Sequence, residues 1–129
     1  MSEPRRRDPK YVPGYNGTGG TLSKGTLVKL NTTGIDDEII ASTATSDAYL
    51  GILQNDLADG EYGDVQVGGI GIALSGAAVT KGSRVMFGTG AKVITCTTGL
   101  TFAGVARTTA SGADEYIEVD IVTGGPVMP

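Results

Sequence analysis

The chain has 129 residues, of which 40% are hydrophobic and 21 are glycine, and it carries a formal net charge of −4 with no histidine and one cysteine. This composition excludes a disordered chain, an internal disulfide and any histidine-based catalytic or zinc site, and its acidic balance argues against a nucleic-acid-binding protein. The length predicts one compact domain. No apolar run approaches the length needed to span a bilayer, so we expect a soluble protein with no membrane partner.

The first twenty residues, MSEPRRRDPKYVPGYNGTGG, differ in character from the rest of the chain. They hold three prolines and four glycines, and residues 1–10 carry four basic side chains against two acidic ones. Proline disfavours a helix, and the closing glycines are typical of a hinge. We therefore expect residues 1–20 to be an extended basic N-terminal arm that becomes ordered only when a partner holds it, followed by a β domain over residues 21–129.

From residue 21 onward, short runs rich in β-branched residues alternate with clusters of Gly, Asn and Asp. The expected strands are TLVKL, EIIAS, AYLGIL, DVQVGGIGIAL, SRVMF, KVITCT, TFAGVART and YIEVDIV. Apolar and polar residues alternate strictly from Tyr116 to Ile121, which is typical of a half-buried strand. Roughly eight to ten such strands at short spacing predict an all-β fold, built as a small glycine-rich β-sandwich or barrel.

Three sequence blocks occur twice in the same order. Ser23–Val28 matches Thr80–Val85, Tyr49–Leu53 matches Thr101–Ala106, and Asp64–Val67 matches Tyr116–Val119 in pattern. The simplest explanation is an internal two-fold repeat, with half-repeats of about 21–74 and 75–124 and a short apolar tail at 125–129. Gly51 and Gly104 align in the second block and are interpreted as structural turns.

A Lys-Gly pair followed by a hydroxyl residue occurs in both halves, at Lys24 and Lys81, and could cradle a phosphate group. A phosphate-binding loop needs a glycine before the lysine and a helix after the loop, and the sequence provides neither. We therefore interpret Gly25 and Gly82 as turn glycines, each at the start of a strand.

The remaining candidates for chemistry are weak. A Ser-Lys dyad at Ser23–Lys24 or within 81–83 is formally possible, but both lie at expected turns. Cys96 lies in an alternating strand and is interpreted as a packed side chain. The acidic clusters at 36–38 and 114–115 lack the spacing of a calcium loop, and the glycine-rich strand lacks the dinucleotide-binding pattern. We expect no catalytic residues, no cofactor and no metal, and therefore no enzyme.

The basic run in the arm has three interpretations: a contact with nucleic acid, a contact with a protein surface, and an inert solubility tail. Three arginines are a small footprint for nucleic acid on an acidic protein. A protein surface is the interpretation we favour, because a basic segment can become ordered along an acidic partner.

Residues of about 21–124 resemble the decoration, or cement, proteins of tailed-phage capsids. The resemblance lies in the order of the blocks: a polar arm, then SKGTLV, YLGIL, GEYGDVQVGGIG, VTKGSRV and FAGVA. It implies a non-enzymatic virion structural protein, made in the host cytoplasm, that binds the major capsid protein on the capsid exterior. It also implies a homotrimer that stabilises the shell against internal pressure.

For the contact with the shell, we expect the arm to supply Arg and Tyr side chains, which are enriched at interfaces. The candidate residues are Arg5, Arg6, Arg7, Lys10, Tyr11 and Tyr15. Deleting residues 1–20 is then expected to leave a folded protein that no longer attaches. The alternative is another β-rich virion component: a head fibre base, a tail tube or a carbohydrate-binding module. The absence of Trp, with five Tyr and two Phe, argues against the carbohydrate-binding module.

Overall fold

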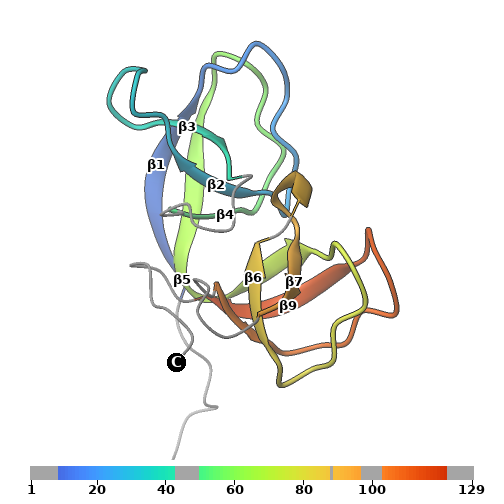
Figure 1. Cartoon of the computed structure of the whole chain (residues 1–129). Helices are drawn as coiled ribbons and strands as arrows, with labels where there is room; N and C mark the ends of the chain where they lie inside the picture. The colour runs from blue at the N-terminus through green and yellow to red at the C-terminus, as the bar shows by residue number, and fades with distance from the viewer. Residues whose placement is uncertain (1–8, 43–49, 88, 97–102, 122–129) are drawn as a thin grey trace, which may run out of the picture.

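A computed structural model of the chain describes residues 9–42, 50–87, 89–96 and 103–121 (Figure 1). The described elements are β1 (Lys10–Asn16), β2 (Leu27–Leu30), β3 (Glu38–Ala41), β4 (Gly51–Leu53), β5 (Tyr62–Leu74), β6 (Arg84–Phe87), the 3-10 turn η1 (Thr89–Ala91), β7 (Val93–Thr95), β8 (Gly104–Ala106) and β9 (Tyr116–Ile121). The predicted all-β fold is confirmed. None of the described segments is a helix long and apolar enough to cross a membrane.

The first five strands close into a small barrel, which is the upper half of Figure 1. Their order is β1-β3-β2-β4-β5, and β1 also pairs antiparallel with β5, with Val12 opposite Val65, so the ring is complete. Only the β1–β3 pair in this ring is parallel. The buried interior consists of Leu22, Val28, Ile39, Leu53, Leu57 and Val65. Each such side chain contributes about 1.5–3 kcal/mol by leaving water.

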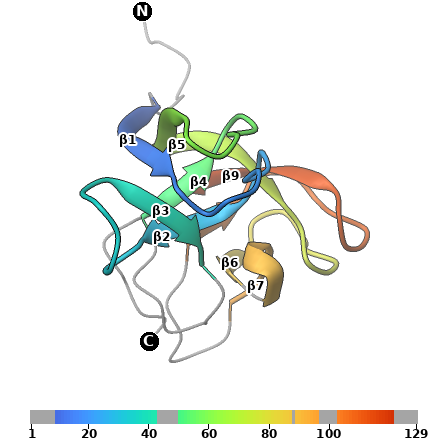
Figure 2. The same ribbon diagram turned by 90° about the horizontal axis from the view of Figure 1, so that it is seen from above.

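Strand β5 continues into the second half, where its residues 69–74 pair with β9. The order there is β5-β9-β8-β6-β7. A parallel bridge between Ser75 and Val93 brings β7 back to the end of β5, so this half closes into a second small barrel. Figure 2 shows β6 and β7 set apart from the strands of the first barrel. Leu27 and Ile52 of the first barrel belong to the core of the second half, so the two halves share packing as well as a strand.

The two halves repeat the same backbone hydrogen bonds. The Gly25 N–H donates to Leu53 O at 2.7 Å, and the Gly82 N–H donates to Ala106 O at the same distance. Leu22 pairs with Leu57 as an isolated antiparallel bridge, and in the same way Val79 pairs with Ala110. The predicted internal repeat is therefore present in the backbone.

The first half begins earlier than the sequence predicts. Residues 10–16, expected to belong to the arm, form β1 inside the barrel. The Asn16 N–H donates to Glu61 O at 2.9 Å, as the Ser75 N–H donates to Glu115 O at 2.8 Å. Strand β1 is therefore the counterpart of residues 69–74 of β5. The halves start near residues 10 and 69, and not at residues 21 and 75 as expected.

The third pair of sequence blocks is aligned two residues out of register. A Cβ added to Gly51 would lie 2.3 Å from Gln66 O, and one added to Gly104 would lie 2.2 Å from Asp120 O. Gln66 is therefore the counterpart of Asp120, which pairs residues 64–67 with 118–121 and not with 116–119. A shift of two residues preserves the alternation of a strand, so the pattern could not reveal the error.

Candidate binding surface

Strand β1 presents one side to the core and the other to solvent. Val12, Gly14 and Asn16 point inward, and side chains at Tyr11 and Tyr15 lie on the opposite side. A Cβ on Gly14 would come within 2.9 Å of both Ile39 and Val65, so the inner side accepts no larger residue there. The alternation leaves Tyr11 with half of its surface exposed.

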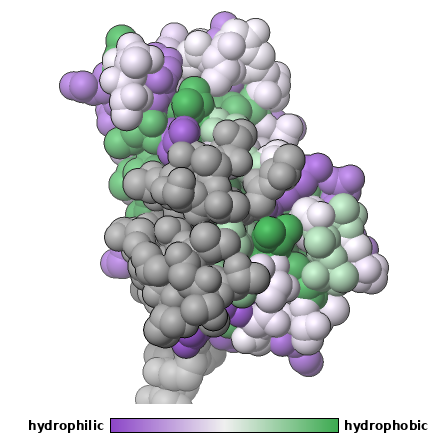
Figure 3. All heavy atoms as spheres, viewed as in Figure 1, coloured by the Kyte–Doolittle hydropathy of each residue, from purple (hydrophilic) through white to green (hydrophobic). Residues whose placement is uncertain are grey.

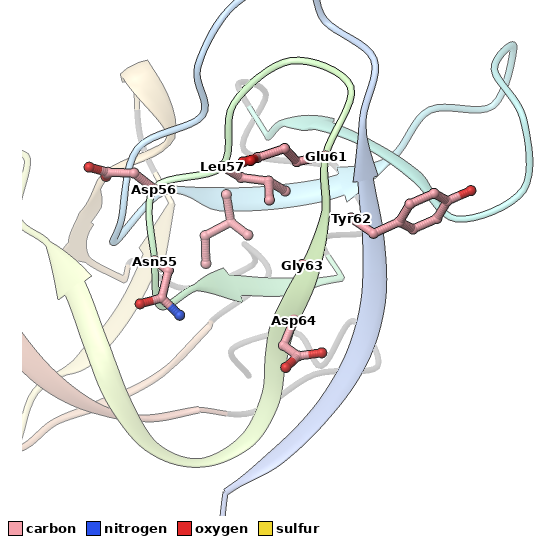
Figure 4. A pocket seen from close by; sticks show the side chains of 8 residues that line it. Asn55, Asp56, Leu57, Glu61, Tyr62, Gly63 and Asp64 are labelled. Atoms are coloured by element: carbon pink, nitrogen blue, oxygen red, sulfur yellow. The ribbon is translucent and has the colours of Figure 1, made fainter.

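A third tyrosine, which comes from β5, extends this outer surface. Tyr15 lies directly opposite Tyr62, and their ring centroids are 4.9 Å apart with the planes tilted by 47°. Tyr62 is 63% exposed, and Figure 4 shows its ring pointing outward across β1. We call the surface formed by Tyr11, Pro13, Tyr15 and Tyr62 the tyrosine face.

One carboxylate, that of Asp64, lies beside the tyrosine face. Asp64 is exposed and lies opposite Pro13 on the paired strands. A shallow groove of about 400 Å³ runs beside β5, and none of the described side chains that line it is basic (Figure 4). Its lining residues are Leu53, Asn55, Asp56, Leu57, Glu61, Tyr62, Gly63 and Asp64. Two of the carboxylates that line the groove stabilise turns. The Asp56 carboxylate accepts the Lys24 N–H and the Glu61 carboxylate accepts the Ala58 N–H, both at 2.8 Å.

The structure brings together half of the residues predicted to contact the shell. Lys10, Tyr11 and Tyr15 all lie on β1, with Lys10 exposed at the end of the strand away from Tyr15. Arg5, Arg6 and Arg7 lie outside the described residues. Sequence reasoning missed Tyr62, although a signal existed, because Glu61-Tyr62 recurs as Glu115-Tyr116 in the second half.

The four glycines predicted as turns fall into two kinds. Gly25 and Gly82 have φ angles of 85° and 89°, in the left-handed region that favours glycine, and each precedes a strand as expected. Gly51 and Gly104 instead open the short strands β4 and β8, where they allow the neighbouring strand to approach closely. Their description as turns is wrong, because the missing Cβ leaves room for a carbonyl oxygen of the adjacent strand.

The two acidic clusters stabilise turns. In the loop between β2 and β3, the Glu38 carboxylate accepts the Asn31 side-chain amide at 2.8 Å. In the second half, Asp114 forms an ion pair with Lys92 at 2.6 Å. Hydrogen bonds from the hydroxyl and backbone N–H of Ser111 lower the pKa of Glu115 below its ordinary value. No group of three potential metal ligands occurs within the part of the chain that the structure describes.

Cys96 and Lys24, which we considered for nucleophilic chemistry, both make contacts that stabilise the fold. Cys96 is buried at the end of β7, and this burial raises the pKa of its thiol, while the nearby charge of Arg84 acts in the opposite direction. A protonated, buried thiol is a poor nucleophile. The ammonium group of Lys24 lies over the ring of Tyr116, 5.0 Å from its centroid. It therefore makes a cation–π contact.

The surface in Figure 3 shows hydrophobic residues beside strongly hydrophilic ones along the left edge of the upper half. Two of the exposed large hydrophobic residues, Leu30 and Ile35, come from the end of β2 and the loop that follows it. Exposed apolar and aromatic residues with charged neighbours are typical of a surface that binds another protein.

These features define a small double-barrel protein whose most distinctive surface is suited to binding a macromolecule. A family model described as phage cement protein matches residues 12–121, and the chain belongs to this family. The match extends from β1 to the last residue of β9, so it covers both barrels. The protein is accordingly a structural component of a phage virion.

One solved structure with the same fold is that of the head fiber gp8.5 N base in bacteriophage phi29. It aligns with a TM-score of 0.68 and 14% sequence identity over 92% of this chain and 98% of that one. At this identity the likeness concerns the fold. The search of curated proteins found no match.

Proposed function

We propose that the protein is a decoration protein that binds the major capsid protein on the outer surface of a phage capsid and stabilises the shell against the pressure of packaged DNA. The observation that carries this proposal is the match to the cement family across both barrels. The role needs no catalytic group. It needs a rigid body and a surface that recognises the shell.

The surface that we assign to the shell is the outer side of β1, beginning with Lys10 and Tyr11 and continuing toward Tyr15. Tyrosine supplies a large, rigid contact area and a hydroxyl that can bond to a partner, which is why it is enriched at the centres of interfaces. Arg5, Arg6 and Arg7 come shortly before this strand in the sequence, and we propose that they add to the same contact.

The double barrel suits mechanical reinforcement. Strand β5 belongs to both halves, and Leu27 and Ile52 of the first half pack in the core of the second half. A body attached at more than one point opposes separation of the shell subunits beneath it. We further propose that three copies act together as a homotrimer, and that the protein is made in the host cytoplasm before it attaches to the capsid exterior.

A head fibre base is the second candidate function. The observation that favours it is the shared fold with the phi29 head fiber base over nearly the full length of both chains. A fibre base would carry a projecting structure at its capsid site, whereas a cement protein acts through the shell contact alone. Electron microscopy of decorated capsids, with and without the protein, distinguishes the two by showing whether a fibre disappears together with it.

The direct test is binding of the purified protein to expanded capsids that lack it, followed by co-sedimentation. We expect saturable binding and greater resistance of DNA-filled capsids to osmotic shock. Lys10→Glu and Tyr11→Ala should each weaken attachment by roughly tenfold, as for residues central to an interface. Arg107→Glu is the matched control for Lys10→Glu, because Arg107 is exposed but belongs to the second half. Equal loss in all three variants, or no binding by the unmodified protein, would contradict the proposal.

A further inference from the structure

Strand β1 has one edge that is only partly covered by a neighbouring strand. On one side it pairs with β5 from Lys10 to Tyr15. On its other side only Tyr15 and Asn16 pair with β3. Residues 10–14 therefore extend beyond β3 as a two-stranded ribbon with β5, along the left side of the upper half in Figure 1.

The backbone groups that point to this edge belong to Tyr11 and Pro13. Residues of an antiparallel pair alternate between those that bond to the partner strand and those whose backbone groups point away from it. The Tyr15 N–H donates to Asp37 O at 2.8 Å, on the side away from β5. By this alternation, the N–H and C=O of Tyr11 and the C=O of Pro13 also point away from β5.

These three backbone groups make no hydrogen bond within the part of the chain that the structure describes, and both residues are exposed. The counterpart of Pro13 in the second half is Ile72, and there the chain fills the same position itself. The Gln54 side chain accepts the Ile72 N–H at 2.9 Å and donates to Ile72 O at 3.1 Å. The edge is therefore covered in the second half and open in the first.

The open groups are two acceptors and one donor, because Pro13 has no N–H. The same edge of a second copy does not match them. In any register, the Tyr11 N–H of each copy satisfies one carbonyl of the other copy, and one carbonyl of each copy is left without a donor. Proline on an edge strand opposes pairing between identical edges in this way. An extended segment without proline supplies the two N–H groups and the one carbonyl that the edge lacks.

We propose that an extended segment of the major capsid protein adds to β1 at this edge as a further strand, hydrogen-bonded to Tyr11 and Pro13. This contact rests on the proposed capsid attachment and specifies how the attachment is made. The edge lies within the surface already assigned to the shell, between Lys10 and Tyr15. Backbone hydrogen bonds then provide affinity, and side chains of the added segment that lie beside the Tyr11 ring provide specificity.

Hydrogen exchange of the Tyr11 amide, in solution and on capsids, tests the added strand. The purified full-length protein is bound to expanded capsids that lack it, exchanged in deuterated buffer, then quenched and released into dimethyl sulfoxide for NMR. We expect the Tyr11 amide to be unprotected in solution and to exchange roughly tenfold more slowly, or slower still, on the capsid. The amides of Val12 and Gly14, which bond to β5, are the reference and should be protected in both states.

Two substitutions of Tyr11 separate its backbone donor from its ring. Tyr11→Ala removes the ring and keeps the N–H, whereas Tyr11→Pro removes both. Because this N–H has no partner within the described part of the chain, both variants should fold and melt at similar temperatures. Tyr11→Pro should bind capsids about five- to tenfold more weakly than Tyr11→Ala, since a carbonyl of the capsid segment then lacks its donor.

The outcomes separate this contact from the attachment itself. Attachment of the unmodified protein with equally fast exchange of the Tyr11 amide in both states would overturn the inference and leave the proposed attachment intact. Equal capsid affinity of Tyr11→Pro and Tyr11→Ala would do the same. Protection of this amide without capsids, rising with protein concentration, would assign the edge to a second copy and overturn the inference too. Absence of any binding to capsids would contradict the proposed function, and the added strand with it.

Discussion

The side-chain amide of Asn16 donates to Leu57 O at 2.7 Å, which joins β1 to a loop 41 residues later in the chain. The same amide donates to Gly20 O at 2.7 Å, and Asn16 is fully buried. We expect Asn16→Ala to lower the free energy of unfolding by about 1–3 kcal/mol, because the buried side chain loses both hydrogen bonds that it donates and Thr18 loses the oxygen that accepts its N–H and hydroxyl. Urea denaturation measures this loss. Asn55→Ala, which removes an exposed amide, is the control and should change stability by less than about 0.5 kcal/mol.

Truncation at the N-terminus should have two different outcomes. Removing residues 2–8 leaves every described contact of β1 in place, so the melting temperature should remain within a few degrees of that of the full chain. Removing residues 1–20 deletes β1 and opens the first barrel along β5, and the shortened chain should fail to fold. Circular dichroism with thermal melting checks both. A cooperative melt of the longer deletion would show that β1 is dispensable and would restore the expectation of an arm over all twenty residues.

The fold class and the repeat could be predicted because they depend on local signals that recur. Alternation marks strands such as β9, and the turn glycines Gly25 and Gly82 mark where two equivalent strands begin. Strand β1 gave no such signal, since Pro13 and Gly14 disfavour a strand by propensity. Its partner β5 lies about fifty residues later in the chain, and pairing at that separation cannot be recognised from local sequence.

The candidate surface was predicted only in part for a related reason. Lys10, Tyr11 and Tyr15 were selected by residue type, and the alternation along β1 then places the two tyrosines on one side. Tyr62 joins them only through the register of β1 against β5, which no local pattern fixes. The same limit explains Gly51, whose role is set by the carbonyl of a neighbouring strand and not by its own segment.

Glycine-to-alanine variants should distinguish glycines that allow a neighbouring strand to approach closely from glycines that lie in open turns. At Gly51 and Gly104 a Cβ would lie 2.3 and 2.2 Å from a backbone oxygen, so each strand must shift to accept alanine. We expect each variant to lose about 3 kcal/mol of stability or more, the upper end for overpacked sites. At Gly20 a Cβ meets no atom of the described residues within 4 Å, and Gly20→Ala should be nearly neutral. Chemical denaturation of the three variants compares them directly. Similar small losses in all three would contradict the close strand approach at Gly51 and Gly104.

Glu115 should titrate below the ordinary range for a glutamate, and Ser111 should be the cause. The hydroxyl and the backbone N–H of Ser111 both donate to the carboxylate, which favours the charged form and lowers the pKa. The lowered pKa stabilises the folded protein at pH values above the pKa that Glu115 has in the unfolded chain. This stabilisation is lost as the pH falls through the pKa that Glu115 has in the folded protein. Ser111→Ala should raise the pKa of Glu115 and reduce the part of the acid-induced loss of stability that it causes.

Ser111→Thr keeps a hydroxyl at the same position and should keep the lowered pKa. A titration of the Glu115 side-chain carboxyl by NMR in the three proteins measures the effect without relying on global stability. An unchanged pKa in Ser111→Ala would assign the shift to the backbone N–H groups of Ser111 and Gly112, which that variant retains. The lowered pKa of Glu115 would then depend on the backbone of this turn, and the side chain of residue 111 would contribute little to it.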